Sequence, residues 1–465
     1  MLVIFWTDAL IALLLLIVVV FCFYVRRKEH LRAPWRQVAR NPLGMAAAVV
    51  LGAYLLIGVL DSIHFHPPLA TRAGEIQYST RVLSVFDLIA TPLRERVEKT
   101  YSAPFATHLY AKETLTLADG RQIRDYPRLK YGGAHLNDPE TDHGYDIVQT
   151  IVRASLEALA IWTLVAGLSI ALLARHWHMR WREGLKAVVG GRTELPWQVI
   201  LVTAGVLIGL AVVATHLSDH YHILGTDKVG QDVFYQSLKS IRTGLVIGTL
   251  TTLVMLPFAI LLGIMAGYFG GRIDDGIQYL YTTLNSIPGV LLIAAAILMT
   301  QVYMATHAAS FESLETRADM RLLFLCMILG VTSWTGLCRL LRGETLKLRE
   351  VDYIQAAHAF GVGNLTIIVR HILPNVMHIV LIAVVLDFSS LVLTEAVLSY
   401  INIGVDPSMI SWGNMINGAR LEMAREPIVW WSLVAAFIFM FGLVLSANLF
   451  SDAVRDGFDP RLRVR

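Results

Sequence analysis

Two carboxylates stand within a long apolar stretch, where charged groups are rare. Asp387 lies near the middle of the run 376–400, and Glu395 lies toward its later end. At about 1.5 Å of rise per residue, Asp387 is roughly 17 Å from either end of a helix over this run. A carboxylate at that depth usually faces a cavity or a partner side chain. Asp387 therefore either lines a path and meets an amino group, or joins two helices by a hydrogen bond.

Histidines form a second group of residues that could carry chemistry, because imidazole binds nickel, copper and zinc. They stand beside apolar runs, with Asp219 among them: His64, His66, His216, His220 and His222. No thiolate and no close helical His pair strengthens a metal site, so side chains at the membrane boundary are the favoured interpretation. No metal or cofactor is predicted. His176 and His178 flank Trp177 near Trp181 and several arginines, a composition typical of an interfacial anchor.

Nucleotide and thiol chemistry find no support in the sequence. No Gly-x-x-x-x-Gly-Lys-Ser/Thr phosphate loop occurs, and not even one Gly-Lys pair. Cys22, Cys326 and Cys338 lie in apolar runs without the paired spacing of a metal site or a disulfide framework. We therefore expect buried, inert thiols, no catalytic residue and no enzyme activity in this chain.

The elements that carry these residues are predicted to be membrane-spanning helices. Of the 465 residues, 55% are hydrophobic and 16% are charged, against about 25% charged in soluble proteins. The net charge of +3 is too small to suggest nucleic acid. A span needs about 20 apolar residues, and nine runs come near that length: 2–25, 43–60, 154–174, 197–216, 243–268, 277–302, 320–341, 376–400 and 429–450. Pro257 and Pro288 are expected to kink their spans.

Basic residues orient the nine predicted crossings, because they gather in cytoplasmic loops. They cluster in the segments 26–40, 175–192, 339–349 and 455–465. These four positions agree with nine alternating crossings, an N-terminus outside and a C-terminus in the cytoplasm. The segment 61–153 then lies outside. Within it, 115–123 is expected to form two strands joined at Asp119-Gly120, and 80–100 is expected to form an amphipathic helix.

The cytoplasmic segment 350–375 is predicted to display two short helices at a bend. Gly361 suits a left-handed helix end, Asn364 suits an N-cap, and Pro374, after Leu373, suits the start of the next span. The first helix has one face at the spacing i, i+3, i+4 and i+7, formed by Tyr353, Ala356, Ala357 and Phe360. This shape fits docking into a groove on a soluble partner, or an ordinary amphipathic connector.

The segment 350–375 resembles the EAA loop of ABC importer permeases. Gln355-Ala356-Ala357, Gly361 and Leu373-Pro374 stand at the family spacing, and the run 370–375 is similar to the dipeptide, oligopeptide and nickel branch. Gln355 replaces the family glutamate and His371 replaces an isoleucine. Residues 41–60 resemble the first core span. Further stretches resemble the same branch: Leu224–Val233, Ala266–Asp274, Ser286–Pro288, Glu395–Ser399, Gly404, Ser411–Asn414 and Asp456–Arg461.

The resemblance implies an all-α polytopic membrane protein with the six-span core of an ABC importer permease, about three extra spans and a small extracytoplasmic insertion. The expected parts are an extra span with a basic linker (1–40), the first core span (41–60), the insertion (61–153), an extra transmembrane hairpin (154–216) and the permease core (217–465), whose coupling loop is 350–375.

The resemblance also implies a function: the permease subunit of an ATP-driven importer in the bacterial inner membrane, forming the path for di- or oligopeptides. The implied partners are a second homologous permease, two cytoplasmic ATPase subunits that hydrolyse the ATP, an extracytoplasmic solute-binding protein and the lipid bilayer. Nickel or another small solute is the alternative cargo; a secondary transporter and a membrane-anchored sensor are the alternative classes. The expected coupling residues are Tyr353, Gln355, Ala356, Ala357, Phe360, Gly361, Leu373 and Pro374, and the candidate path or gating residues are Asp387, Glu395 and Pro288.

Overall fold

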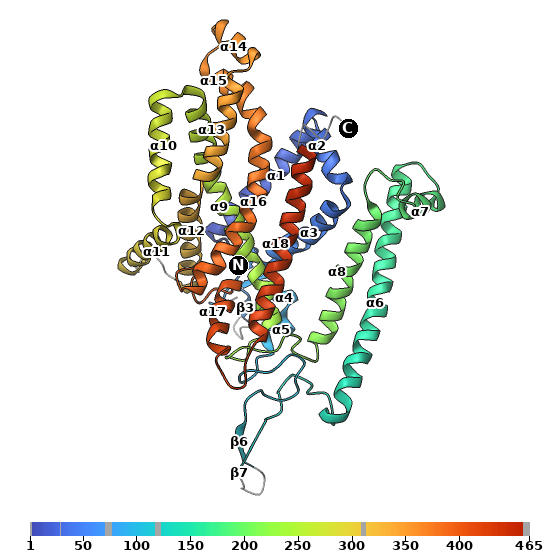
Figure 1. Ribbon diagram of the computed structural model, residues 1–465. Helices are drawn as coiled ribbons and strands as arrows, with labels where there is room; N and C mark the ends of the chain where they lie inside the picture. The colour runs from blue at the N-terminus through green and yellow to red at the C-terminus, as the bar shows by residue number, and fades with distance from the viewer. Residues whose placement is uncertain (1, 28, 70–76, 117–121, 308–312, 459–465) are drawn as a thin grey trace. The chain divides into compact units, whose positions relative to one another are not determined.

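The computed structural model describes residues 2–27, 29–69, 77–116, 122–307 and 313–458. Helices dominate it, as expected for an all-α membrane protein (Figure 1). Within the described residues, eight helical stretches are long and apolar enough to cross a membrane: α3 (Pro42–Asp61), α6 (Pro139–His176), α8 (Trp197–Ser218), α9 (Val233–Phe269), α11 (Gly289–Thr306), Leu314–Arg349, Asn364–Tyr400 and α18 (Trp431–Phe458). The first helix, α1 (Trp6–Arg26), contributes a shorter apolar stretch, Trp6–Val20.

The chain divides into two compact units. The first comprises Met1–Val3, Arg36–Thr243 and Ile410–Phe450, and the second comprises Ile4–Trp35, Gly244–Met409 and Ser451–Arg465. The helices α2 (Glu29–Arg40), α9 and α18 each contribute residues to both units.

The first unit contains the predicted extra hairpin. The helices α6 and α8 pack along each other, with the short helix α7 (Trp181–Val189) between them in the chain and beside the end of α6 (Figure 1). Gly205 permits the close approach, because a Cβ there would lie 2.5 Å from the Nε1 atom of Trp162. That indole nitrogen donates a hydrogen bond of 2.8 Å to the Leu201 carbonyl oxygen. The helix α3 also packs against α8, so the hairpin is joined to an expected core span.

The insertion after α3 is a set of small sheets. A three-stranded antiparallel sheet has the order β1 (Leu2–Val3), β2 (His64–Phe65), β5 (Leu83–Ser84). Two-stranded pairs follow: β3 (Pro68–Leu69) with β4 (Gln77–Tyr78), and β6 (Glu113–Thr116) with β7 (Gln122–Asp125). The last pair confirms the hairpin predicted over 115–123, whose turn at Asp119-Gly120 lies outside the described residues.

The amphipathic helix expected over 80–100 is wrong. The structure has two five-residue helices there, α4 (Val85–Ile89) and α5 (Thr91–Glu95). A capping box at Ser84 starts α4, and Pro92 starts α5, because proline lacks the N–H that would continue α4.

Buried ion pairs hold this insertion to the helices of its own unit. The Lys239 ammonium in α9 lies 3.0 Å from an Asp61 carboxylate oxygen at the end of α3 and 2.6 Å from Asp87 in α4. Ser84 and Tyr235 hydroxyls donate to the same two carboxylates, at 2.6 Å each. Burial raises the pKa of Asp87, but Lys239 and the hydrogen bonds lower this pKa by more than burial raises it. The net shift is downward.

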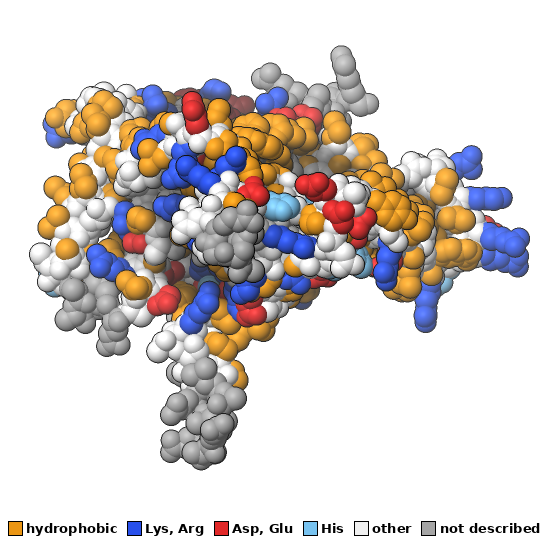
Figure 2. Space-filling model, turned by 90° about the horizontal axis from the view of Figure 1, so that it is seen from below, with side chains coloured by type: hydrophobic (Ala, Val, Ile, Leu, Met, Phe, Trp, Pro, Cys, Tyr) orange, Lys and Arg blue, Asp and Glu red, His pale blue; other side chains and the backbone are white. Residues whose placement is uncertain are grey.

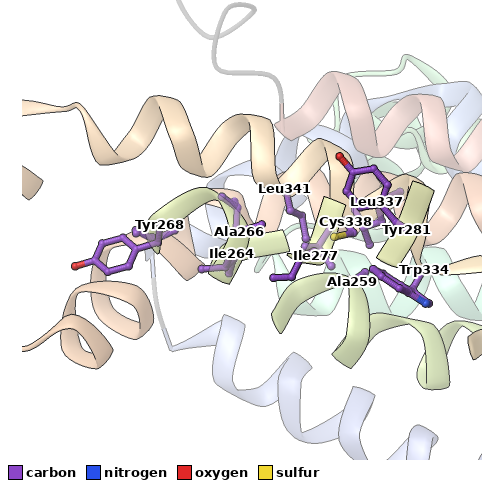
Figure 3. Packing of buried hydrophobic residues seen from close by; sticks show 14 of the residues in the cluster. Ala259, Ile264, Ala266, Tyr268, Ile277, Tyr281, Trp334, Leu337, Cys338 and Leu341 are labelled. Atoms are coloured by element: carbon purple, nitrogen blue, oxygen red, sulfur yellow. The ribbon is translucent and has the colours of Figure 1, made fainter. Parts of the chain in front are cut away.

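The second unit is organised around α9. Its main core cluster joins α9 to α10 (Gly271–Ser286), α13 (Thr335–Arg349) and the segment that follows (Figure 3). Gly263 and Gly267, a small-xxx-small pair, let α13 approach, because a Cβ at Gly263 would lie 2.8 Å from the Cys338 carbonyl oxygen. Arg342 on α13 holds α10 by two hydrogen bonds to Asp274, at 2.6 and 2.7 Å.

Two expectations about the second unit are wrong. The single span predicted over 277–302 is divided: α10 ends at Ser286 and α11 begins at Gly289. Ile287 is extended (φ −90°, ψ 131°), because the residue before a proline avoids the helical region. Pro288 therefore separates two helices, whereas α9 runs on through Pro257. Cys22 was expected to be buried and is exposed on α1, while Cys326 and Cys338 are buried.

Candidate functional site

The segment 350–375 stands beyond the end of α13, at the tip of the second unit (Figure 1). Its first helix is α14 (Asp352–Ala359). Ile354 is buried, and the opposite side, including Tyr353, Ala356 and Phe360, is exposed. Phe360 is 87% exposed. Three residues of the predicted helix face are therefore left uncovered, whereas the fourth, Ala357, is half-buried.

Gly361 ends α14 in the left-handed region, at φ +77°. A Cβ at this position would meet no heavy atom within 4 Å, so only the backbone conformation favours glycine. Gly363, two residues later, also has open space but an ordinary φ of −63°. The bend is thus created by one backbone position.

The second helix differs from the prediction. It begins at Asn364 as expected, but its N-cap is Gly363, and the Asn364 side chain instead accepts a 3.0 Å hydrogen bond from the Tyr268 hydroxyl. It does not stop at Leu373. The helix α15 (Asn364–Ile367) continues through a π-helical turn, η2 (Ile368–Ile372), into α16 (Leu373–Tyr400). A wider turn accommodates Pro374, which has no N–H to donate to the preceding turn.

The bend is packed onto the spans that it follows. Ile354, Ile367 and the partly buried Val362 belong to the same core cluster as α9 and α13. Ala357 is half-buried in that contact, and Leu373 is also packed against it. The helix α14 is therefore joined to α9 and α13 by packed side chains.

A groove of about 470 Å³ adjoins this exposed face. The Gln355 amide donates to a Glu350 carboxylate oxygen at 3.3 Å, and Arg349 donates to the same side chain at 3.0 Å. Both polar and apolar side chains line the groove, which suits a protein surface. Its lining residues are Tyr268, Phe269, Arg349, Glu350, Ile354, Gln355, His358, Ala359 and Asn364.

The candidate path residues lie apart from the bend. Asp387 is half-buried in α16, and within the described part of the chain its carboxylate has no hydrogen bond or ion pair. Glu395 is 2% exposed and accepts a 2.7 Å hydrogen bond from Ser399. Pro288 starts α11. Among the residues that the structure describes, Glu395 therefore has a structural partner and Asp387 has none.

The histidines expected at the membrane boundary have separate partners. His216 lies 2.8 Å from Glu157, and the His220 ring contacts the His135 ring at a 4.3 Å centroid distance, with the two planes tilted by 44°. Among the described residues, no group of three or more His, Cys, Asp or Glu has the arrangement of a metal site.

His222 forms a buried charge cluster that the sequence did not reveal. Its Nδ1 atom lies 2.7 Å from Asp232, and its Nε2 atom lies 3.5 Å from Glu98 in the insertion. Burial alone lowers the pKa of His222, but the two carboxylates raise it to about 9. Asp232 falls within the family-like segment Leu224–Val233, whereas nothing in the sequence pairs Glu98 with it.

Comparisons with known proteins give a consistent result. The family model "Binding-protein-dependent transport system inner membrane component" matches residues 259–464. The chain is 31% identical over 242 residues to the glutathione transport system permease protein GsiD of Pectobacterium atrosepticum, covering 52% of this chain and 73% of that protein. It is 31% identical to the oligopeptide permease protein OppC of Mycobacterium bovis, over 52% and 77%. It is 28% identical to the dipeptide permease protein DppC of Lactococcus lactis, over 52% and 64%.

Among solved structures, a chain of the MetNI methionine ABC transporter in inward-facing conformations aligns with a TM-score of 0.34 and 17% identity. The alignment covers 47% of this chain and 93% of that chain. The assignment to a family therefore rests on the sequence relatives.

Proposed function

The chain belongs to the binding-protein-dependent transport system inner membrane component family, and we propose that the cargo of this permease subunit is a peptide. It is a multi-pass inner-membrane protein of an ABC importer. The relatives compared above are named for glutathione, oligopeptides and dipeptides, which are all chains of amide-linked amino acids. Their names support a di- or oligopeptide cargo over nickel, another small solute or a secondary transport mechanism.

The observation that carries the mechanism is the exposed bend at α14 and Gly361. Two ATPase subunits on separate chains bind nucleotide and close, and one of them presses on Tyr353, Ala356 and Phe360. The groove beside Gln355 receives a side chain of that ATPase. Because Ile354 and Ile367 pack on α9 and α13, the motion shifts the spans and biases a two-state path.

The remaining parts follow from the family. A second homologous permease completes the path, and a solute-binding protein delivers the cargo from outside. The N-terminus and the insertion 61–153 lie outside, and the C-terminus lies in the cytoplasm. Residues 1–40, 61–153 and 154–216 are additions to a core formed by 41–60 and 217–465. The family match at 259–464 supports the later part of this core.

Asp387 and Pro288 are the proposed path or gating residues. The unpartnered carboxylate of Asp387 recognises a cargo amine, and the break at Pro288 lets α11 move separately from α10. Glu395, which is buried and bonded to Ser399, holds the outer end of α16 instead.

One experiment tests the coupling proposal. Cysteines at exposed Gln355 and His358 should crosslink to an ATPase subunit in the assembled complex, and a cysteine at Arg124, exposed on β7 of the insertion, should not. In the same complex, Gly361→Val should lower labelled-peptide uptake severalfold while membrane insertion persists, because a β-branched residue is strained at positive φ. Gly363→Val is the matched control and should transport normally.

The opposite results have clear meanings. Normal uptake by Gly361→Val together with no crosslink from position 355 or 358 would make the bend an ordinary connector. Uptake of nickel but not of labelled di- or oligopeptides would replace the proposed cargo and leave the coupling role intact.

A further inference from the structure

The short helix α7 has three differently composed sides. Gly184 and Val188 are buried against α6. Next to them, Trp181, Leu185 and Val189 recur every four residues and form an apolar stripe, with exposed fractions of 44%, 37% and 64%. The remaining side carries Arg182, Lys186 and Glu183, which are all exposed.

The level of α7 along α6 shows what surrounds the apolar stripe. A Cβ at Gly184 would lie 2.8 Å from the Ala174 Cβ, and one at Gly167 would lie 3.9 Å from the Trp181 ring. Gly167 precedes the end of α6 at His176 by nine residues, which is about 13 Å along the helix. The chain therefore folds back, and Trp181 reaches a part of α6 that belongs to its membrane span.

The neighbouring surface of α6 at this level is apolar and exposed. Leu164, Leu168 and Leu172 are 69%, 58% and 60% exposed. Such side chains on a membrane-spanning helix face acyl chains. The stripe of α7 lies at the same depth, so it enters the edge of the hydrocarbon layer, where Trp is a preferred residue.

The charges beside the stripe are positive and largely uncompensated. Arg175, Arg182 and Lys186 have no carboxylate within ion-pair distance in the described part of the chain. Glu194 pairs with Arg36 instead, and Glu183 accepts a hydrogen bond from the Arg180 backbone. Figure 2 shows Lys and Arg side chains gathered beside hydrophobic ones at the edge formed by the α6–α8 hairpin.

We propose that α7 is an interfacial helix that binds anionic phospholipid of the cytoplasmic leaflet. The stripe Trp181, Leu185 and Val189 inserts among the upper acyl chains, and Arg182 and Lys186 contact lipid phosphates. This gives the extra hairpin a role: it anchors the first unit to the cytoplasmic leaflet. The inference rests on the membrane-spanning character of α6 and not on the identity of the cargo.

The depth of α7 is tested with the full-length chain in phosphatidylglycerol-containing nanodiscs, in a Cys22→Ser background because Cys22 is exposed. A bimane probe at Val189→Cys should be quenched by lipid carrying a nitroxide near the headgroup and protected from iodide. The matched probe at Glu183→Cys, on the same helix, should be quenched by iodide. Iodide quenching of equal strength at both positions would overturn the proposal. Protection of position 189 from both iodide and the nitroxide lipid would also overturn it, because it would indicate that a second copy of the chain covers the stripe.

The lipid preference is tested by mass spectrometry of lipids retained from nanodiscs containing phosphatidylglycerol and phosphatidylcholine. The double variant Arg182→Gln, Lys186→Gln should lower the enrichment of phosphatidylglycerol at least about fivefold. Fivefold corresponds to the loss of one basic residue near an anionic surface and is the minimum expected when two are removed. Arg153→Gln removes an exposed cation of α6 that lies far from α7 along the helix and pairs with Glu157, and it should leave the enrichment unchanged. Unchanged enrichment in the double variant would refute the anionic preference.

Discussion

At the scale of single residues, His222 is the buried cation of a cluster with two carboxylates. Its pKa is raised to about 9 by Asp232 and Glu98 despite its burial. A raised folded-state pKa means that the charged form stabilises the fold fully below the unfolded pKa of about 6.5. The contribution is lost as the pH rises through about 9.

We therefore predict that His222→Gln destabilises the protein by about 3 kcal/mol near pH 7, because it leaves two buried carboxylates without their cation. Thermal denaturation of the purified chain in detergent measures the effect. The difference in melting temperature between wild type and variant should narrow above pH 9. His307→Gln, at an exposed position, is the control. A difference that stays constant from pH 6 to 10 would contradict the charged cluster.

Asp387 is the residue whose role depends most directly on its environment. Its carboxylate has no partner in the described structure, so a neutral replacement should not weaken assembly. We predict that Asp387→Asn lowers uptake of amine-bearing cargo about tenfold, the loss of one charge-assisted hydrogen bond of roughly 1.5 kcal/mol. Uptake and the yield of detergent-extracted complex measure the two effects.

Glu395→Leu provides the contrast to Asp387→Asn, because it removes the buried carboxylate that accepts the hydrogen bond from Ser399. It should lower the yield of complex. Wild-type uptake by Asp387→Asn would eliminate charge recognition by this residue.

Single residues also show how far the sequence could be interpreted. Gly361 was predicted to be left-handed because few other residues tolerate that conformation, and its φ of +77° confirms this. Asn364 was expected to cap a helix, but its side chain bonds the Tyr268 hydroxyl, 96 residues away in the chain. Local rules predict backbone conformation well. They do not reveal which distant group competes for a side chain, and the same limit hid the Glu98–His222 contact.

At the scale of elements, three prolines beside or within apolar helices gave three outcomes. Pro288 ends one helix and begins another, Pro257 lies inside continuous α9, and Pro374 follows a π-helical turn in a continuous helix. Hydropathy predicts where apolar helices lie, but it does not distinguish a proline that ends a helix from one that lies inside a continuous helix. Which outcome occurs depends on whether neighbouring helices and a wider turn can satisfy the released carbonyl group.

The sequence predicted the extra hairpin and the strands of the insertion, but it did not predict how α7 folds back on α6. Hydropathy gave both helices of the hairpin, α6 and α8, and the turn residues gave the strands β6 and β7. The backward fold of α7 could not be predicted, because it depends on Gly184 meeting Ala174 in three dimensions. The sequence offered only the interfacial composition around Trp177 and Trp181.

At the scale of the whole molecule, strand pairing bears on the orientation of the chain. The strand β1, before α1, pairs with β2, which follows α3. Because the two strands are hydrogen-bonded to each other, β1 and β2 must lie on the same side of the membrane. The basic segment 26–40 between α1 and α3 then lies on the opposite side if both helices cross. This agrees with the distribution of Arg and Lys, which is an independent criterion.

We predict from this arrangement that the insertion and the coupling bend lie on opposite sides. In a Cys22→Ser background, Arg124→Cys on β7 should react with a membrane-impermeant maleimide in intact spheroplasts, since its side chain is exposed. His358→Cys, also exposed, should react only after permeabilisation. Cys326 and Cys338 are buried and should remain unlabelled. Labelling of position 358 from outside would show that the orientation is the reverse of the predicted one, with α14 out of reach of any cytoplasmic ATPase. Failure of position 124 to react in intact spheroplasts would place the insertion inside.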